Sequence, residues 1–285
     1  MEKINGFRKE DLASALKFKF DNEYPFVIAG PCVIESAAAA EDIAKTLKEY
    51  SEELSFNLIF KASYDKANRT SVNSFRGPGI DKGLEILNGI KAKYNIPVLS
   101  DVHGANEMEK VKAVLDVIQI PAFLCRQTDM LLEAAKTGKV VNVKKGQFLA
   151  PWDTKFIAEK IRSAGNNKII LTERGASFGY NNLVTDFRAL PIMKETGALV
   201  VFDATHSVQI PGGSGSVSSG NREYVMPLAR AAAAVGTDGL FFEVHPNPPQ
   251  ALSDSANSVY LNSFKDNLKN ILEISKYSKE IDVKE

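Results

Sequence analysis

Cysteine, net charge and long apolar runs are what this chain has least of. Cys32 and Cys125 are its only cysteines among 285 residues; two are too few for a disulfide-stabilised fold, so we expect a reducing, cytoplasmic location. Its 35 basic and 35 acidic side chains cancel to a formal net charge of zero, which argues against nucleic acid as the main partner. No apolar run approaches the ~20 residues that span a bilayer, and the N-terminal segment lacks the apolar core of a signal peptide. We therefore expect no membrane association.

The overall composition is that of an ordinary folded protein. Hydrophobic residues make up 44% and charged residues 25% of the chain, proportions that argue against wholesale disorder, a collagen-like fibre or a disulfide scaffold. A chain of this length can bury a large core, and roughly 250 residues is a common size for a single α/β barrel.

Eight short runs rich in β-branched or aromatic residues recur along the sequence. Each is apolar at its start, as expected of strands that are buried on both faces. The predicted strands are Phe26–Cys32, Leu58–Ser63, Pro97–His103, Val117–Ala122, Val140–Gly146, Ile169–Gly175, Leu199–His206 and Gly239–Pro246.

Amphipathic segments of helical period lie between these runs. The predicted helices are Glu41–Leu54, Gly83–Tyr94, Glu107–Leu115, Lys155–Ile161, Tyr224–Val235 and Leu261–Tyr277. Eight alternations predict an α/β protein with a single (β/α)8 TIM barrel over residues 26–280, preceded by an N-terminal extension over residues 1–25. A doubly wound open sheet is the alternative.

Polar side chains gather in the second half of each predicted strand. In the fifth strand, Val141 and Val143 share one face while Asn142 and Lys144 share the other. Because side chains alternate along a strand, we expect the valines to face the helices and the polar pair to face the barrel mouth. One such residue is more often a solvated rim group or a helix cap. Unpaired charges inside a barrel would cost several kcal/mol each, so polar residues at the same end of all eight strands indicate a functional cluster.

The cationic members of this cluster predict an anionic ligand. Arginine grips phosphate or carboxylate bidentately and lysine supplies a point charge, so a small phosphorylated substrate fits the set. The cationic residues are Lys61, Lys66, Arg69, Arg126, Lys144 and Arg174.

A second subset has the chemistry of a metal site. Cys32, His206 and Glu243 end the first, seventh and eighth predicted strands, and Asp254 follows in the next loop. A thiolate, an imidazole and two carboxylates suit Zn²⁺, Fe²⁺ or Mn²⁺. The alternative is a buried Cys32 that acts as a small hydrophobic residue, with His206 hydrogen-bonded in the rim.

A glycine- and serine-rich loop, Ser207–Asn221, follows the seventh predicted strand. Loops longer than about 12 residues are uncommon in compact domains and are often functional. We expect a lid here rather than a simple connector.

Several motifs, in the order in which they occur, resemble the 3-deoxy-D-manno-octulosonate 8-phosphate synthases over about residues 25–280. They are Asp65-Lys66-Ala67-Asn68-Arg69 with Thr70-Ser71, Pro121-Ala122-Phe123-Leu124-Cys125-Arg126-Gln127-Thr128-Asp129, Val141-Asn142-Val143-Lys144-Lys145-Gly146-Gln147-Phe148, Thr172-Glu173-Arg174-Gly175, Phe178-Gly179-Tyr180-Asn181-Asn182, Asp203-Ala204-Thr205-His206-Ser207 and Glu243-Val244-His245-Pro246.

The resemblance implies a transferase that condenses phosphoenolpyruvate with D-arabinose 5-phosphate and water. The products are 3-deoxy-D-manno-octulosonate 8-phosphate and inorganic phosphate, on the route to bacterial lipopolysaccharide. The family is cytoplasmic and usually homotetrameric. The runner-up is the similar DAHP synthase family, which uses erythrose 4-phosphate and carries a Lys-Pro-Arg-Thr-Ser type segment where this chain has Lys66-Ala67-Asn68-Arg69-Thr70-Ser71.

The resemblance also implies site residues. Lys61, Lys66, Gln119, Lys144 and Arg174 match the phosphoenolpyruvate site, and Asn68, Arg69 and Thr70 match the arabinose 5-phosphate site, which Arg126 is expected to reach from a neighbouring subunit. Lys66, Lys144, His206 and Asp254 are the expected catalytic residues. Gly30-Pro31-Cys32 resembles the metal-dependent type, with Cys32, His206, Glu243 and Asp254 as ligands. Thr70 replaces the usual serine, and Asn73 replaces a common histidine.

Two other functions are compatible with the same cations. A metal-dependent aldolase would release no inorganic phosphate, and a catalytically inactive sugar-phosphate sensor would have lost a site residue, of which none is missing here. A phosphate-release assay separates these alternatives.

Overall fold

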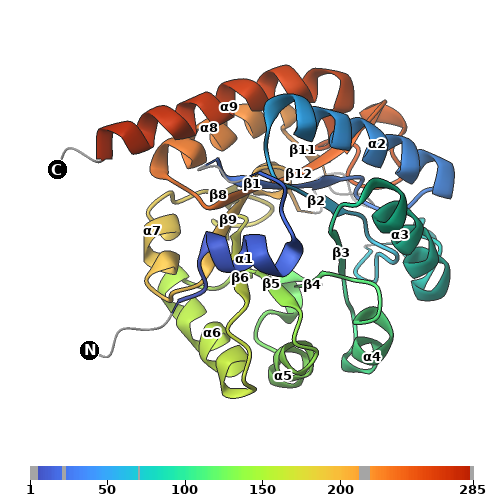
Figure 1. The fold of residues 1–285 in the computed structure, drawn as a ribbon, viewed down its shortest axis with the longest axis horizontal. Coiled ribbons are helices and arrows are strands. Elements are labelled where there is room, and N and C mark those ends of the chain that lie inside the picture. Colours follow the sequence, from blue (N-terminus) through green and yellow to red (C-terminus); the bar gives the residue numbers. More distant parts are fainter. Residues whose placement is uncertain (1–5, 21–23, 70, 212–218, 283–285) are drawn as a thin grey trace.

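The computed structural model describes residues 6–20, 24–69, 71–211 and 219–282. Eight parallel strands form its centre, in the order in which they occur along the chain (Figure 1). They are β1 (Phe26–Gly30), β2 (Leu58–Lys61), β3 (Val98–Asp101), β4 (Val117–Ile120), β5 (Val140–Lys144), β6 (Ile169–Glu173), β9 (Leu199–Asp203) and β12 (Gly239–His245).

The last barrel strand pairs with the first, which closes the sheet. β12 runs parallel to β1 with Phe26 opposite Gly239 and Gly30 opposite Glu243. This pairing confirms the predicted (β/α)8 barrel and rules out the open sheet. All eight predicted strands are present, because strands buried on both faces leave uninterrupted apolar runs in the sequence.

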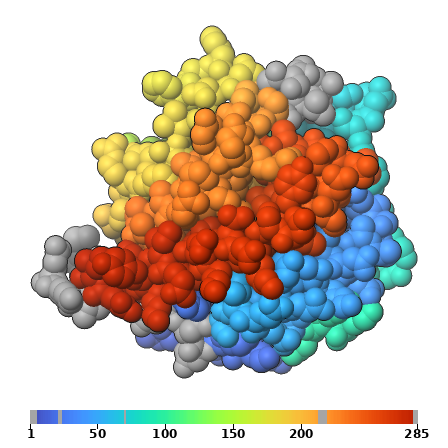
Figure 2. Space-filling model, turned by 90° about the horizontal axis from the view of Figure 1, so that it is seen from above, coloured from blue at the N-terminus to red at the C-terminus, as the bar shows by residue number. Residues whose placement is uncertain are grey.

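Helices surround the barrel and cover its outer face (Figure 1). They are α2 (Ala37–Leu54), α3 (Ile80–Tyr94), α4 (Met108–Val111), α5 (Thr128–Lys136), α6 (Thr154–Ser163), α7 (Ala189–Lys194), α8 (Val225–Val235) and α9 (Leu261–Asp282). Figure 2 shows α9 crossing one face between α8 and α2, so the last helix lies beside the first barrel helix. No helix in the described part of the chain is long and apolar enough to cross a membrane.

The helix predictions were right in six places and incomplete in others. α4 is shorter than the predicted Glu107–Leu115, because the chain after Val111 turns to bring Asp116 to the start of β4, where its carboxylate accepts the Val98 N–H at 3.0 Å. α5 and α7 were not predicted. α7 is only six residues long and contains a proline, so its sequence carries little helical signal.

Two apolar layers result from the alternation of side chains along the strands. Val141 and Val143 pack outward against the helices, as predicted, whereas Val140 points into the barrel. Asn142 and Lys144, which alternate with the outward-facing valines, are buried on the inner side. Each strand therefore contributes one face to the shell and the other to the interior.

The amino-terminal end of the barrel is closed by α1 (Lys9–Leu16), which crosses the ring of strands in Figure 1. Leu12 and Leu16 on this helix, together with Phe7, pack against inward-facing strand residues such as Phe26 and Ile28. The opposite, carboxyl end is left free for polar groups.

Three short strand pairs lie at the carboxyl end of the barrel. β7 (Ala176–Ser177) pairs with β8 (Leu183–Val184), and β10 (Gln209–Ile210) pairs with β11 (Ser219–Gly220), both antiparallel. β13 (Val259–Tyr260) extends β12 in parallel. The predicted lid, Ser207–Asn221, contains the β10–β11 pair, and its central residues 212–218 lie outside the described residues.

Candidate active site

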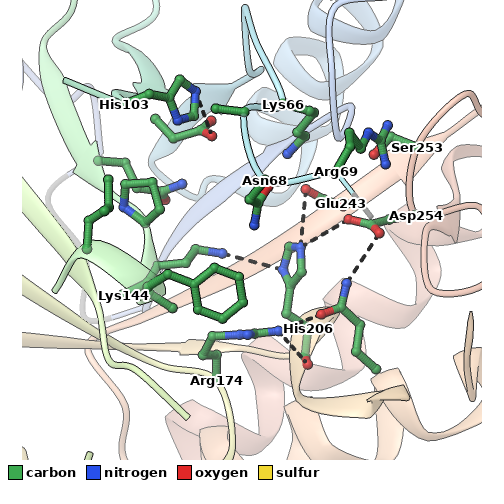
Figure 3. Close-up of a pocket in the computed structure, with 18 of the residues that line it drawn as sticks. Lys66, Asn68, Arg69, His103, Lys144, Arg174, His206, Glu243, Ser253 and Asp254 are labelled. Atoms are coloured by element: carbon green, nitrogen blue, oxygen red, sulfur yellow. Dashed lines mark hydrogen bonds and ion pairs between the residues drawn. The ribbon is translucent and has the colours of Figure 1, made fainter. Parts of the chain in front are cut away.

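A cavity of about 480 Å³ opens at the carboxyl ends of the barrel strands (Figure 3). It collects most of the site residues that the sequence predicts, although they are spread over almost 200 positions of the chain. Those that line it are Lys61, Lys66, Asn68, Arg69, Gln119, Lys144, Arg174, His206, Glu243 and Asp254.

One side of the cavity holds a cluster of metal-binding side chains. Ligand atoms of Cys32, Glu243 and Asp254 all lie within 4.8 Å of one another. His206 Nε2 lies 3.5 Å from both Glu243 Oε1 and Asp254 Oδ2, and Figure 3 shows this imidazole pointing between the two carboxylates. Cys32 Sγ lies 3.2 Å from Asp254 Oδ2 and 2.8 Å from Ser253 Oγ.

The donor set fits a divalent cation. Glu243 Oε2 is buried and has no hydrogen-bond partner among the described residues, so an acceptor faces inward without a donor. Burial raises the pKa of the Cys32 thiol well above its usual value, and the nearby Asp254 and Glu243 raise it further. A bound cation would relieve both conditions, because it lowers a thiol pKa and satisfies a carboxylate oxygen.

Asp254 is held in an unusual backbone conformation. Its φ of +47° is left-handed, which few residues other than glycine adopt. Burial works against the ionisation of Asp254, but its hydrogen bond with His206 and the charge of Lys66 outweigh burial and hold its pKa well below the usual range. A charged carboxylate on a strained backbone is typical of a functional position.

Asp203 fixes the orientation of both Lys144 and His206. Its Oδ2 accepts from Lys144 Nζ and lies 2.7 Å from His206 Nδ1, while Oδ1 accepts the His206 backbone N–H at 2.9 Å. With Nδ1 held by Asp203, the other ring nitrogen faces the carboxylates, as in many metal sites. Burial lowers the pKa of Lys144 and Asp203 opposes the shift; the Lys144 ammonium also lies 3.6 Å from the Phe241 ring centroid.

The Lys61 ammonium is hydrogen-bonded to other groups of the protein. Its Nζ donates to Glu243 Oε1 at 2.7 Å and to the Cys32 carbonyl at 2.8 Å, and only 1% of its side chain is exposed. The ammonium therefore acts as a buried counter-ion that aligns Glu243 with Cys32.

Arg174 and Gln119 complete the inner wall. Arg174 is buried, which lowers its pKa, and its Nη2 donates to Gln209 Oε1 at 2.6 Å. Gln119 Oε1 accepts from Asn142 Nδ2 at 3.0 Å, and Thr172 Oγ1 donates to Asn142 Oδ1 at 2.6 Å. This chain of hydrogen bonds gives the buried side chains of Gln119, Asn142 and Thr172 partners inside the barrel.

Lys66 points toward Glu243 and Asp254, two of the metal-binding side chains (Figure 3). Burial alone would lower the pKa of Lys66, but the nearby Cys32 and the carboxylates of Asp101, Glu243 and Asp254 raise it above its usual value. Asp101 accepts a hydrogen bond from Ser63 and lies 3.6 Å from His103 Nε2. His103 Nε2 in turn lies 3.0 Å from the Asp65 carbonyl, which ties the segment that carries Lys66 to β3.

The predicted sugar-phosphate residues come from the segment after β2. Asn68 and Arg69 reach the cavity mouth. Arg69 Nε donates to the Phe75 carbonyl and its Nη2 donates to the Leu252 carbonyl, both at 3.1 Å. The latter bond joins this segment to the loop that carries Asp254. Thr70, which the sequence also predicts, lies outside the described residues.

Arg126 is a predicted substrate-binding residue that the structure does not bring to this cavity. It is exposed and is not among the described residues that line the cavity. Its carbonyl accepts from Lys160 Nζ at 3.1 Å on the outer side of α6. The prediction placed Arg126 in the site of a neighbouring subunit, which a single chain does not test.

The structure adds residues to the site for which no role was predicted. Asp101, His103 and Asp203 lie in the second halves of predicted strands, and that position was the available signal. Gln209 lies in the two-residue strand β10 and Ser253 in the loop after β12, where the chain is too irregular for periodicity to carry information, so only the folded arrangement reveals them.

Comparisons with known proteins agree on one family. The model of the DAHP synthetase I family matches residues 16–280. A protein of Geobacter sp. (strain M21) that is named 2-dehydro-3-deoxyphosphooctonate aldolase is 60% identical to this chain over 248 residues. The match covers 87% of this chain and 91% of the relative. The protein of that name from Francisella tularensis subsp. holarctica is 56% identical over 258 residues, 90% of this chain and 94% of its own length. In Syntrophotalea carbinolica the identity is 55% over 256 residues, with 90% and 92% covered.

Proposed function

The chain belongs to the DAHP synthetase I family, and on that premise we propose that it condenses phosphoenolpyruvate with D-arabinose 5-phosphate. The products are 3-deoxy-D-manno-octulosonate 8-phosphate and inorganic phosphate, in the biosynthesis of KDO for lipopolysaccharide. The observation that carries the proposal is that Lys66, Arg69, Lys144 and Arg174 line one cavity. Two phosphorylated reactants need this many fixed cations.

The relatives favour arabinose 5-phosphate over erythrose 4-phosphate as the acceptor. The family model is named for DAHP synthesis, but the relatives at 55–60% identity carry the name 2-dehydro-3-deoxyphosphooctonate aldolase. The segment Lys66-Ala67-Asn68-Arg69 points the same way, since DAHP synthases carry a proline-containing segment there.

The phosphoenolpyruvate site is proposed to lie deep in the cavity. Lys66, Lys144 and Arg174 bind its phosphate and carboxylate, and Gln119 donates through its amide. Lys61 contributes indirectly, because its ammonium is paired with Glu243. The arabinose 5-phosphate site lies at the cavity mouth. Its proposed residues are Asn68, Arg69, Thr70 and, from a neighbouring subunit, Arg126.

In the proposed reaction, the electron pair of the phosphoenolpyruvate C2=C3 double bond forms a bond from C3 to the sugar aldehyde carbon, and water adds at C2. The C2–O bond to phosphate then breaks, which releases inorganic phosphate and leaves a ketone at C2, while the aldehyde oxygen takes up a proton that the water supplies. Negative charge grows on the aldehyde oxygen. Lys66, which stays protonated because the negative groups around it raise its pKa, stabilises that charge. Lys144, held by Asp203, orients phosphoenolpyruvate. Such preorganised charges stabilise a transition state without having to reorganise.

The proposed metal site consists of Cys32, His206, Glu243 and Asp254. These ligand types suit Zn²⁺, Fe²⁺ or Mn²⁺. When bound, a divalent ion supplies Lewis-acid stabilisation of oxygen charge. His206 and Asp254 are proposed as catalytic residues because they belong to this metal site and also line the cavity.

We further propose a cytoplasmic homotetramer. Large aromatic side chains are exposed on neighbouring βα connections and on α6, and such residues often mark protein interfaces. They are Phe123 (57% exposed), Phe148 (58%), Trp152 (62%) and Phe156 (51%). Arg126 lies close to Phe123 in sequence, so an interface here would carry it toward another subunit. Within each subunit, residues 1–25 are the extension and residues 26–280 the catalytic barrel.

A phosphate-release assay tests the proposed function. The protein is incubated with phosphoenolpyruvate and either arabinose 5-phosphate, erythrose 4-phosphate or no sugar, with and without a chelator. We expect inorganic phosphate only with arabinose 5-phosphate and only without the chelator. Faster release with erythrose 4-phosphate would transfer the proposal to DAHP synthesis, and condensation without phosphate release would indicate an aldolase.

A further inference from the structure

Gln209 bridges two groups that the proposed function assigns to different ligands. Its Oε1 accepts from Arg174 Nη2 at 2.6 Å, and its Nε2 donates to Asp254 Oδ1 at 3.3 Å. Arg174 is proposed to bind phosphoenolpyruvate, and Asp254 is a proposed metal ligand. A single side chain therefore connects the two halves of the site.

The orientation of this amide follows from its neighbours. Turning it around would place the NH2 group against the Arg174 guanidinium and the carbonyl oxygen against the Asp254 carboxylate. Both contacts would then pair like partners, donor with donor and acceptor with acceptor. Only the observed orientation satisfies a cation on one side and an anion on the other.

The backbone of Gln209 is held as tightly as its side chain. Gln209 pairs with Gly220 across the β10–β11 ladder. A Cβ atom on Gly220 would lie 1.5 Å from Asn257 Oδ1, so this glycine allows the hairpin to rest directly on the segment after β12. The Asn257 backbone N–H donates to the Asp254 carbonyl at 3.0 Å. The hairpin and the turn of Asp254 are thus packed as one unit.

Arg174 depends on this bridge for its direction. Its Nη2 also donates to the His206 carbonyl at 3.3 Å, while its Nε is buried without a hydrogen-bond partner among the described residues. Gln209 therefore fixes the plane of the guanidinium and leaves one N–H edge available for a ligand. Preorganised arginines bind planar anions bidentately.

We propose that Gln209 is a positioning residue that couples metal binding at Asp254 to phosphoenolpyruvate binding at Arg174. The proposal rests on the proposed function of the site. A cation that binds the Asp254 carboxylate changes the acceptor that is available to Gln209 Nε2. Because the Oε1 atom of the same amide accepts from Arg174 Nη2, this change reaches the orientation of the Arg174 guanidinium. Coupling between two binding sites is reciprocal, so phosphoenolpyruvate must change metal affinity by the same factor.

Calorimetric titration of the full-length protein measures this coupling. Phosphoenolpyruvate is titrated into metal-stripped protein and into protein saturated with Mn²⁺, and the ratio of the two dissociation constants is the coupling factor. We expect a factor of about fivefold or more in the wild type. Gln209→Met keeps the length of the side chain but removes both hydrogen bonds, and we expect its factor to fall about threefold or more below that of the wild type.

Two further variants make the test specific. Gln250→Met is a matched control at an exposed position and should keep the wild-type factor. Gln209→Glu keeps an acceptor for Arg174 but sets a carboxylate against Asp254. It should weaken phosphoenolpyruvate binding, because it neutralises Arg174, without weakening Mn²⁺ binding. A merely structural role would weaken both ligands together, alongside a lower melting temperature.

The outcomes separate this inference from the proposed function. A wild-type protein that neither binds phosphoenolpyruvate nor releases phosphate from it would defeat both. A wild type that does so, with a Gln209→Met variant of unchanged coupling factor, would defeat the bridge alone. Should Gln209→Met not fold, Gln209→Glu decides the matter, and parallel losses of phosphoenolpyruvate and Mn²⁺ affinity would overturn the inference.

Discussion

The two ends of the barrel are built from opposite kinds of side chain. At the amino-terminal end, α1 places Leu12 and Leu16 against inward-facing apolar residues such as Phe26. At the carboxyl end, the same strands turn charged groups such as Lys144 and Glu243 inward. The apolar end needs no ligand to be stable, whereas the charged end carries groups whose desolvation is only partly repaid within the protein. Stability and function are therefore expected to separate along the barrel axis.

The largest expected effect comes from the thiol at the charged end. Cys32→Ala removes a proposed metal ligand, and we expect bound metal to be lost and kcat to fall about a thousandfold or more, because metal stabilisation is worth several kcal/mol. Metal content and phosphate release measure this. Cys125→Ala is the matched control, since Cys125 is also buried but lies outside the cluster. Full activity of Cys32→Ala in chelator would contradict the metal assignment.

A substitution at the apolar end should lower the stability of the fold rather than the activity. Leu12 is completely buried, so Leu12→Ala is expected to lower the free energy of unfolding by about 2–5 kcal/mol. Its effect on kcat/KM at a temperature where the variant is folded should be slight. Denaturant titration and phosphate-release kinetics provide the two numbers. A large loss of kcat/KM without a loss of stability would break the division between the two ends.

A pair of aspartates tests the same division with identical chemistry. Asp203 holds Lys144 and His206 at the carboxyl end, so Asp203→Asn should cost about 10–100-fold in activity or metal affinity. At the opposite end, Asp238 accepts a hydrogen bond from Lys194 Nζ at 2.9 Å and from the Val200 N–H at 2.8 Å. Asp238→Asn should alter the melting temperature while sparing kcat. Equal losses of kcat in both variants would refute the comparison.

Much of this division could be predicted from the sequence. Strands buried on both faces leave apolar runs, and polar residues in the second halves of those runs mark the end that faces the site. The role of α1 could not be predicted in this way, because a short helix before the first strand does not reveal what it covers. Pairing partners such as Asp203 with His206, or Gln209 with Arg174, depend on side-chain directions that no spacing encodes.

The smallest effect is expected at the cavity mouth. Arg69→Ala should raise the KM for arabinose 5-phosphate about tenfold or more, because a hydrogen bond to a charged group is lost, and should change the KM for phosphoenolpyruvate less. Arg76→Ala is the control in the same segment, since the Arg76 side chain pairs with Asp65 and is not among the described residues that line the cavity. Steady-state kinetics with each substrate varied give the ranking, and the reverse order would overturn the assignment of the two substrate sites.

A crystal structure of the protein with Mn²⁺ and phosphoenolpyruvate bound would test the central claim most directly, namely that the charged end of the barrel is the reaction site. The account predicts an anomalous peak within bonding distance of Cys32 Sγ, with phosphoenolpyruvate in contact with Lys144 and Arg174. Metal bound away from Cys32, or phosphoenolpyruvate bound outside this cavity, would contradict it.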